Sequence, residues 1–171
     1  MSDHPGAVTF KGTPLTLSGD LPAGGVSAPA VTVIGNDMGT VSLDTFRGKV
    51  LVLLSVPSLD TPVCDLEVRR FNDAATRLSP TVAVAVVSMD LPFAQARWCG
   101  AHGIARVQAF SDHREAAFGR AFGVLIAEWR LLARAVFVLD AGGVIRYREL
   151  VPEITQEPDY EAALKAVAAL C

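Results

Sequence analysis

Cys64 is the residue whose position points most directly to chemistry. It is the third residue of a helix that the sequence predicts from Pro62, with Thr61 at the N-cap position. A helix N-terminus offers unpaired backbone N–H groups and the positive end of the helix dipole, both of which favour a thiolate. Because the thiolate is the nucleophilic form of cysteine, this arrangement predicts a reactive sulfur. The alternative interpretation of Cys64 is an inert thiol buried in the core.

The elements around Cys64 form a strand, a short loop and a helix. The apolar, branched run at residues 50–56 predicts a buried strand directly before the loop. Apolar residues between positions 63 and 78 then recur at helical spacing, and Ser79-Pro80 is expected to end the helix. A strand, a short loop and a capped helix with an early cysteine indicate a thioredoxin-like scaffold.

The rest of the chain alternates strand and helix patterns. We expect an N-terminal hairpin over residues 8–17, within an extension of about residues 1–20, and a C-terminal hairpin over residues 135–148. The other expected elements are strands over 31–34, 41–43, 81–87 and 107–110, and helices over 91–101, 113–122 and 160–170. This order predicts one α/β domain over residues 1–171, with a central mixed β-sheet flanked by helices.

Composition limits the classes of function. A chain of 171 residues with 51% apolar and 19% charged residues fits one folded domain and argues against disorder. A net charge of -3 without any basic block gives no reason to expect nucleic-acid binding, and no apolar run is long enough for membrane binding by a spanning helix. Three cysteines form no disulfide framework and the N-terminus lacks a secretory pattern, so we expect a cytoplasmic protein.

Two segments carry a resemblance to a known family. Residues 57–64, Pro-Ser-Leu-Asp-Thr-Pro-Val-Cys, match the Pro-x-x-x-Thr-x-x-Cys signature of peroxiredoxins. Residues 88–100, Ser-Met-Asp-Leu-Pro-Phe-Ala-Gln-Ala-Arg-Trp-Cys-Gly, resemble the resolving-cysteine helix of the bacterial thiol peroxidases, which are atypical two-cysteine peroxiredoxins. Residues 133–136 and 153–160 are similar to the same branch, and the likeness runs over about residues 8–170.

The resemblance implies a role for each residue near Cys64. Cys64 would be the peroxidatic cysteine, and the hydroxyl of Thr61 would lie beside the sulfur and the incoming oxygen while also capping the helix. Pro57 would shield the sulfur from water. Acidic residues at positions 65 and 67 disfavour a neighbouring thiolate, so a cation must offset them, and the family's candidate is Arg134. The alternative interpretation of Arg134 is a surface ion-pair residue.

The resemblance also implies a catalytic cycle. Cys99 would be the resolving cysteine, which forms an intramolecular disulfide with Cys64 after a hydroperoxide has oxidised Cys64 to a sulfenic acid. Since the two cysteines lie on different predicted helices, we expect parts of both to unfold locally during turnover. The expected partners are hydrogen peroxide or organic hydroperoxides as substrate, thioredoxin as reductant and a second copy in a homodimer. No cofactor and no metal site is expected.

Two other redox functions compete with this interpretation. A general disulfide oxidoreductase needs Cys-x-x-Cys at the helix start, but Thr61 stands where the first cysteine would be. A peroxide sensor would use the same Cys64–Cys99 switch without sustained turnover. One segment departs from the family pattern: residues 127–134 are shorter than usual and lack a Gly/Pro loop. Trp98 and Trp129 are interpreted as packing residues, and Cys171 as a spare terminal thiol.

Overall fold

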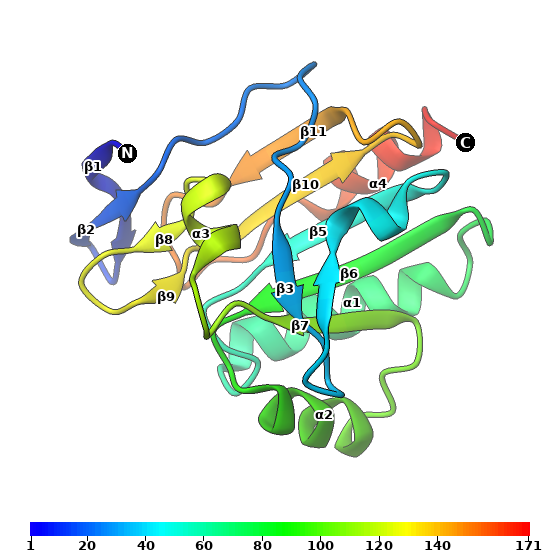
Figure 1. Ribbon diagram of the computed structural model, residues 1–171, viewed down its shortest axis with the longest axis horizontal. Helices are drawn as coiled ribbons and strands as arrows, with labels where there is room; N and C mark the ends of the chain where they lie inside the picture. Colours follow the sequence, from blue (N-terminus) through cyan, green and yellow to red (C-terminus); the bar gives the residue numbers. More distant parts are fainter.

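A mixed seven-stranded sheet forms the centre of the computed structural model, which describes residues 1–171 (Figure 1). Its strand order is β11-β10-β5-β6-β7-β3-β4, with β5, β6 and β7 parallel and every other pair antiparallel. The bounds of these strands are β3 Thr32–Ile34, β4 Thr40–Ser42, β5 Val50–Ser55, β6 Val82–Ser88, β7 Val107–Ser111, β10 Ala135–Leu139 and β11 Ile145–Leu150. The expected thioredoxin-like α/β architecture is confirmed.

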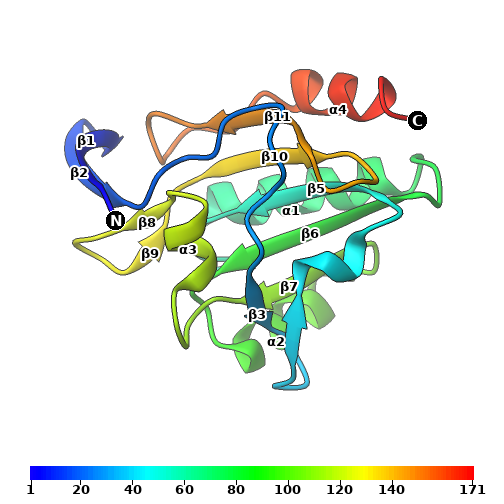
Figure 2. The same cartoon turned by 45° about the horizontal axis from the view of Figure 1, so that its top comes forward.

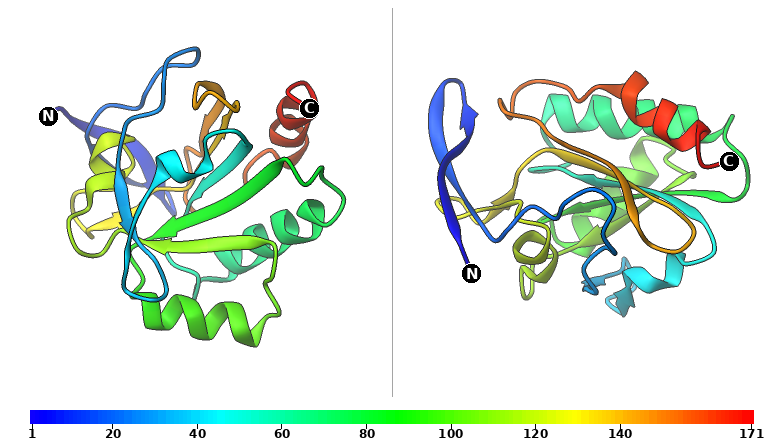
Figure 3. Two further views of the ribbon diagram at one scale, coloured as in Figure 1. Left: turned by 45° about the vertical axis from the view of Figure 1, so that its right-hand side comes forward. Right: turned by 90° about the horizontal axis from the view of Figure 1, so that it is seen from above.

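The helices are divided between the two faces of this sheet, as the view from above shows (Figure 3). One face carries α1 (Pro62–Ala75), α2 (Pro92–Ala101) and α4 (Tyr160–Ala168). The other carries α3 (Ala117–Ala121) and the 3₁₀ helix η1 (Leu43–Phe46). Alternate residues of β5 bury into each layer, with Val52 and Leu54 toward α1 and Leu51 and Leu53 toward α3. Both layers are therefore closed by apolar packing.

A second, four-stranded antiparallel sheet lies at one end of the molecule, in the order β1-β2-β8-β9 (Figure 2). Its strands are β1 Asp3–Phe10, β2 Thr13–Ser18, β8 Leu125–Ile126 and β9 Leu131–Leu132. The expected N-terminal hairpin is confirmed as β1 and β2. The short 127–134 segment belongs to this sheet: it supplies the tight turn between β8 and β9, with Arg130 in the left-handed region at φ 52°.

Several expected boundaries are wrong. Helix α1 ends at Ala75, before the Ser79-Pro80 signal, and the helix expected over 113–122 is only the five residues of α3. The strand expected over 41–43 is β4, which ends at Ser42, and Leu43 begins the 3₁₀ helix η1. Trp98 is a buried packing residue as expected, but Trp129 is 41% exposed at the turn between β8 and β9. Short elements lack the repeated periodicity by which sequence patterns mark an element. None of the helices combines the length and apolar composition needed to cross a bilayer.

Gly123 fixes the approach of the N-terminal segment to the central domain, and this gives a stability prediction. Gly123 has φ +64°, and a Cβ there would overlap backbone atoms of Asp20 and Leu21. Gly12 also has a left-handed φ, +81°, but nothing lies within 4 Å of its added Cβ. In urea unfolding, we expect Gly12→Ala to lower the free energy of unfolding by about 1 kcal/mol, and Gly123→Ala by about 3 kcal/mol or more. Equal losses would contradict the proposed backbone overlap.

Candidate active site

Cys64 lies in the first turn of α1, on the face that packs against the sheet. Its sulfur is on the buried stripe that continues through Glu67, Val68 and Phe71, at the spacing of one helix face. The helix begins at Pro62, as the sequence predicts, so Cys64 is its third residue. Cys64 is completely buried and forms no disulfide. Burial alone does not make it an inert core thiol, because a cation lies beside its sulfur.

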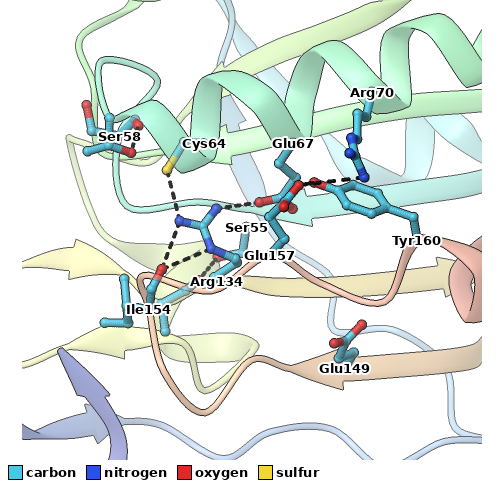
Figure 4. A network of polar contacts seen from close by, with 12 residues as sticks. Ser55, Ser58, Cys64, Glu67, Arg70, Arg134, Glu149, Ile154, Glu157 and Tyr160 are labelled. Carbon is cyan, nitrogen blue, oxygen red and sulfur yellow. Dashed lines mark hydrogen bonds and ion pairs between the residues drawn. The ribbon is translucent and has the colours of Figure 1, made fainter. Parts of the chain in front are cut away.

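Arg134 is that cation. It follows β9 and precedes β10, and its side chain points across the sheet toward α1 (Figure 4). Its Nη2 donates to the Sγ of Cys64 at 3.4 Å, and its Nη1 donates to the carboxylate of Glu67 at 2.5 Å. Arg134 is only 1% exposed, so the alternative interpretation of a surface ion-pair residue is wrong. The planar fork of the guanidinium allows one side chain to hold both partners.

The carbonyl oxygen of Ile154 fixes the orientation of this guanidinium. It accepts hydrogen bonds from Nε of Arg134 at 3.1 Å and from Nη2 at 3.0 Å. The loop that carries Ile154 is tied to the N-terminal hairpin, since the backbone N–H of Ile154 donates to the carbonyl of Thr9. The neighbouring Glu153 accepts hydrogen bonds from the hydroxyl of Thr9 and from the backbone N–H groups of Lys11 and Gly12. The hairpin therefore helps to place Arg134.

Glu67 competes with Cys64 for the charge of Arg134. Burial raises the pKa of Glu67 to about 7, although the guanidinium of Arg134 acts in the opposite direction. Burial also acts to lower the pKa of Arg134, but the negative charges of Glu67 and Cys64 outweigh it, and the net shift is upward. The guanidinium therefore stays charged, and one buried cation faces two acidic groups.

The second acidic residue beside Cys64, Asp65, points away from Arg134. Its Oδ2 lies 3.4 Å from Arg69 on the same helix, and its Oδ1 lies 3.3 Å from Nε2 of His102. The sequence predicts one cation, Arg134, for both carboxylates, but Arg134 pairs with Glu67 alone. It does not show that Asp65 and Glu67 have separate partners.

Thr61 and Pro57 lie in the loop between β5 and α1. Thr61 occupies the N-cap position, but the expected side-chain cap is wrong: its hydroxyl donates to the carbonyl of Ser58 at 2.9 Å instead of accepting from the helix. This leaves the N–H groups of the first turn without a side-chain acceptor from Thr61. Pro57 is buried at the end of β5, and both residues line the same cavity as Arg134.

This cavity, of about 490 Å³, lies beside the first turn of α1, with Arg134 on its wall. Its wall is largely apolar and includes Phe10 and Trp129, whose rings meet edge to face at 5.1 Å. The complete lining is Phe10, Lys11, Pro57, Thr61, Pro62, Val63, Trp129, Leu131, Arg134, Ile154 and Thr155. A small apolar molecule with a polar reacting end fits this arrangement.

Cys99 is not part of this cluster. It lies on α2, is half-buried against the layer that contains Cys64, and is a free thiol. Burial raises the pKa of Cys99, so it is protonated near neutral pH and is not itself an activated nucleophile. Cys171 is free and exposed. The structure thus brings together Cys64, Arg134, Thr61 and Pro57, and leaves Cys99 on a separate helix.

Comparison with known proteins identifies the family. The family model described as Redoxin matches residues 23–164, which include Cys64, Cys99 and Arg134. The chain belongs to the redoxin family. A thiol peroxidase of Bacillus subtilis is 52% identical to it over 163 residues, covering 95% of this chain and 97% of the relative. A thiol peroxidase of Oceanobacillus iheyensis is 53% identical over 157 residues, covering 92% and 95%.

A solved structure supports the same assignment. The crystal structure of a peroxiredoxin-like protein from Aquifex aeolicus superposes with a TM-score of 0.90 at 41% identity, covering 98% of this chain and 99% of that one. With the curated relatives, it confirms the resemblance to peroxiredoxins of the thiol peroxidase type. This redoxin is an oxidoreductase with peroxiredoxin-type thiol peroxidase activity, and the sensor interpretation is not favoured.

Sequence reasoning misses three features of the site. Glu67 was treated only as an unfavourable charge, although its position three residues after Cys64 places it on the same buried face and indicates a shared partner. The carbonyl of Ile154 has no sequence signal, because every residue carries one. The aromatic wall of the cavity was also missed, since residues 10 and 129 meet only through the second sheet.

The raised pKa of Glu67 predicts how stability depends on pH. The folded state holds this proton up to about pH 7, whereas an unfolded glutamate releases it near pH 4.5. The folded state thus binds more protons between these values, so the stabilisation is complete below pH 4.5 and is lost as pH rises through 7. We expect Glu67→Gln to remove a decline of about 3 kcal/mol in the free energy of unfolding between pH 4.5 and 7.

Urea unfolding at several pH values measures this difference. The matched control is Glu161→Gln, which changes an exposed carboxyl in the first turn of α4. The free energy of unfolding of this variant should follow the wild-type pH profile. A Glu67→Gln profile parallel to that of the wild type would contradict a protonated Glu67 in the folded protein.

Proposed function

We propose that this thiol peroxidase reduces hydroperoxides with the Cys64 thiolate as its nucleophile. The sulfur attacks the terminal peroxide oxygen, the O–O bond breaks, and Cys64 becomes a sulfenic acid. The leaving alkoxide or hydroxide takes a proton and departs as alcohol or water. The reaction needs an anionic sulfur and donors near the breaking bond.

The contact between Arg134 and Cys64 carries this proposal. A permanently charged guanidinium 3.4 Å from the sulfur stabilises the thiolate before the reaction. The N-terminal N–H groups of α1 add further positive potential at the same point. In the cycle that we propose, Thr61 positions the peroxide through its hydroxyl, and Pro57 keeps water from the sulfur. All four residues lie in or beside one cavity.

Cys99 completes the proposed cycle. Its thiol attacks the sulfenic sulfur of Cys64, which releases water and forms an intramolecular disulfide. Because Cys64 is buried and Cys99 lies on another helix, the first turn of α1 and part of α2 must unfold locally before the two sulfurs meet. Thioredoxin then reduces this disulfide by thiol–disulfide exchange, which requires a reducing compartment such as the cytoplasm. We propose a homodimer as the functional assembly, on the family resemblance.

The apolar cavity supports organic hydroperoxides as substrates alongside hydrogen peroxide. A substrate whose alkyl or aryl group lies against Phe10 and Trp129 buries apolar surface that hydrogen peroxide lacks. The peroxide end of that substrate would point toward Arg134.

Replacement of each cysteine separates the two steps of the cycle. We expect Cys64→Ser to abolish peroxide consumption, because no other sulfur lies beside Arg134. Cys99→Ser should consume one equivalent of peroxide and then stop as a sulfenic acid. Intact mass spectrometry with a dimedone trap detects this product, and a coupled assay with thioredoxin and its reductase measures turnover.

Cys171→Ser is the matched control, since this thiol is exposed at the end of the chain. It should turn over like the wild type. Full turnover by Cys64→Ser or sustained turnover by Cys99→Ser with thioredoxin would contradict the proposed cycle.

Trp129 gives a separate test of the substrate class. We expect Trp129→Ala to lower kcat/KM for cumene hydroperoxide about tenfold, because one exposed aromatic wall of the cavity is lost. The same variant should reduce hydrogen peroxide at the wild-type rate, since that substrate is too small to contact the wall. Steady-state kinetics with both peroxides measures the ratio, and an equal loss for both would argue against apolar recognition.

A further inference from the structure

Asp90 lies between β6 and α2, and its carboxylate binds the loop that precedes α1. Its Oδ1 accepts a hydrogen bond from the hydroxyl of Ser58 at 2.7 Å, and its Oδ2 accepts one from the backbone N–H of Leu59 at 2.8 Å. The hydroxyl of Ser88 also donates to Oδ2, at 2.7 Å. The carboxylate thus accepts three hydrogen bonds, two of them from the loop that leads to Cys64. We call these contacts the Asp90 clamp.

The other end of α2 also touches the Cys64 segment. His102, the C-cap residue of α2, stacks on Trp98, and its Nδ1 donates to the carbonyl of Trp98 at 2.9 Å. Its Nε2 lies 3.3 Å from Oδ1 of Asp65, the residue after Cys64. That oxygen is buried and has no hydrogen-bond partner. Because Nδ1 already donates to Trp98, the contact is an ion pair only when Nε2 also carries a proton, so it is the weaker of the two. We call it the His102 clamp.

Between these two clamps lies the helix that carries Cys99. Three side chains anchor its length, Pro92, Gln95 and Trp98, while the residues between them are exposed or half-buried. Gln95 connects α2 to the Asp90 clamp, since its amide donates to the hydroxyl of Ser88, which in turn donates to Asp90. The same amide also donates to the carbonyl of Phe110. Each end of α2 is therefore connected to the segment around Cys64, through Ser58 and Leu59 at one end and through Asp65 at the other.

We infer that Asp90 and His102 are positioning residues that control how long the Cys64 sulfenic acid persists. While both clamps hold, Cys64 stays beside Arg134 and Cys99 stays away from it. When they open, the first turn of α1 and the ends of α2 are released together, because each clamp joins a segment at the start of α1 to a segment beside α2. This inference rests on the proposed Cys64–Cys99 disulfide and adds the contacts that set its rate of formation.

Two reactions compete for the sulfenic acid, and the clamps decide between them. After release, the Cys99 thiol attacks, and one disulfide and one water form. While the clamps hold, a second hydroperoxide can transfer its oxygen to Cys64, which gives a sulfinic acid and one alcohol or water. Weaker clamps therefore mean faster disulfide formation and less sulfinic acid. Simple damage to the active site would instead slow the cycle.

Three variants of the full chain test the inference. Asp90→Asn removes a charged acceptor, and we expect disulfide formation to be about tenfold faster. Ser58→Ala removes one donor to Asp90 and His102→Ala removes the weaker contact, with Asp65, and each should give an increase of about threefold. Rapid acid quench and mass spectrometry after one equivalent of hydrogen peroxide measure the rate. Excess peroxide measures the sulfinic fraction, which should fall in the same order.

Two variants far from the cysteines serve as matched controls. Asp140→Asn changes an aspartate that accepts several hydrogen bonds in the β10–β11 turn, and His4→Ala removes the exposed pair between His4 and Asp20. Both should form the disulfide at the wild-type rate. Hydrogen exchange adds a second readout: amides of α2 and of the first turn of α1 should exchange faster only in the clamp variants.

The possible outcomes distinguish this inference from the proposed function. Absence of a Cys64–Cys99 disulfide in the wild type overturns both. A wild-type disulfide that forms at an unchanged or slower rate in Asp90→Asn, Ser58→Ala and His102→Ala overturns the clamps alone. If Asp90→Asn is too unstable to purify, Ser58→Ala and His102→Ala decide, because both keep the carboxylate of Asp90.

Discussion

The fold depends at its functional centre on one buried positive charge, the guanidinium of Arg134. A buried charge is costly unless it is paired and hydrogen-bonded, and this one has the sulfur of Cys64, the carboxylate of Glu67 and the carbonyl of Ile154 as partners. Two acidic groups face this one cation, Cys64 and Glu67. Burial raises the pKa of Glu67 to about 7, so Glu67 is largely protonated below that pH. With Glu67 protonated, the positive charge of Arg134 acts mainly on the sulfur of Cys64.

Four parts of the fold contribute to holding this charge in place: β10, α1, the 153–154 loop and the N-terminal hairpin. Strand β10, which follows Arg134 directly, pairs on both sides within the seven-stranded sheet, so hydrogen bonds to β5 and β11 fix the backbone next to Arg134. Helix α1 brings Cys64 and Glu67 to the charge from one side, and the 153–154 loop brings a carbonyl from the other. The N-terminal hairpin holds that loop through Thr9 and Glu153, although it lies outside the central sheet.

Much of this could be predicted from the sequence, and the exceptions share a physical cause. The buried strand 50–55, the Pro62 helix start and the hairpin over 135–148 were predicted correctly, because each is encoded by local periodicity or turn chemistry. Strands β8 and β9 are too short to show any period. The Ile154 carbonyl and the contact of His102 with Asp65 depend on tertiary contacts, so no local pattern marks them. Thr61 occupies its expected position, but its hydroxyl has another partner.

The two halves of the proposed cycle place opposite demands on the same segment. In that cycle, attack on a peroxide needs Cys64 held rigidly beside Arg134, whereas disulfide formation needs Cys64 to leave it. The structure separates these demands between elements: Arg134 belongs to the central sheet, whereas Cys64 lies in a first helical turn and Cys99 on a helix held at its ends. Glu67, one turn further into α1, and the carbonyl of Ile154 remain as partners for the guanidinium when the sulfur withdraws. Release of Cys64 therefore leaves the guanidinium hydrogen-bonded through Nε, Nη1 and Nη2, which lowers the cost of the movement.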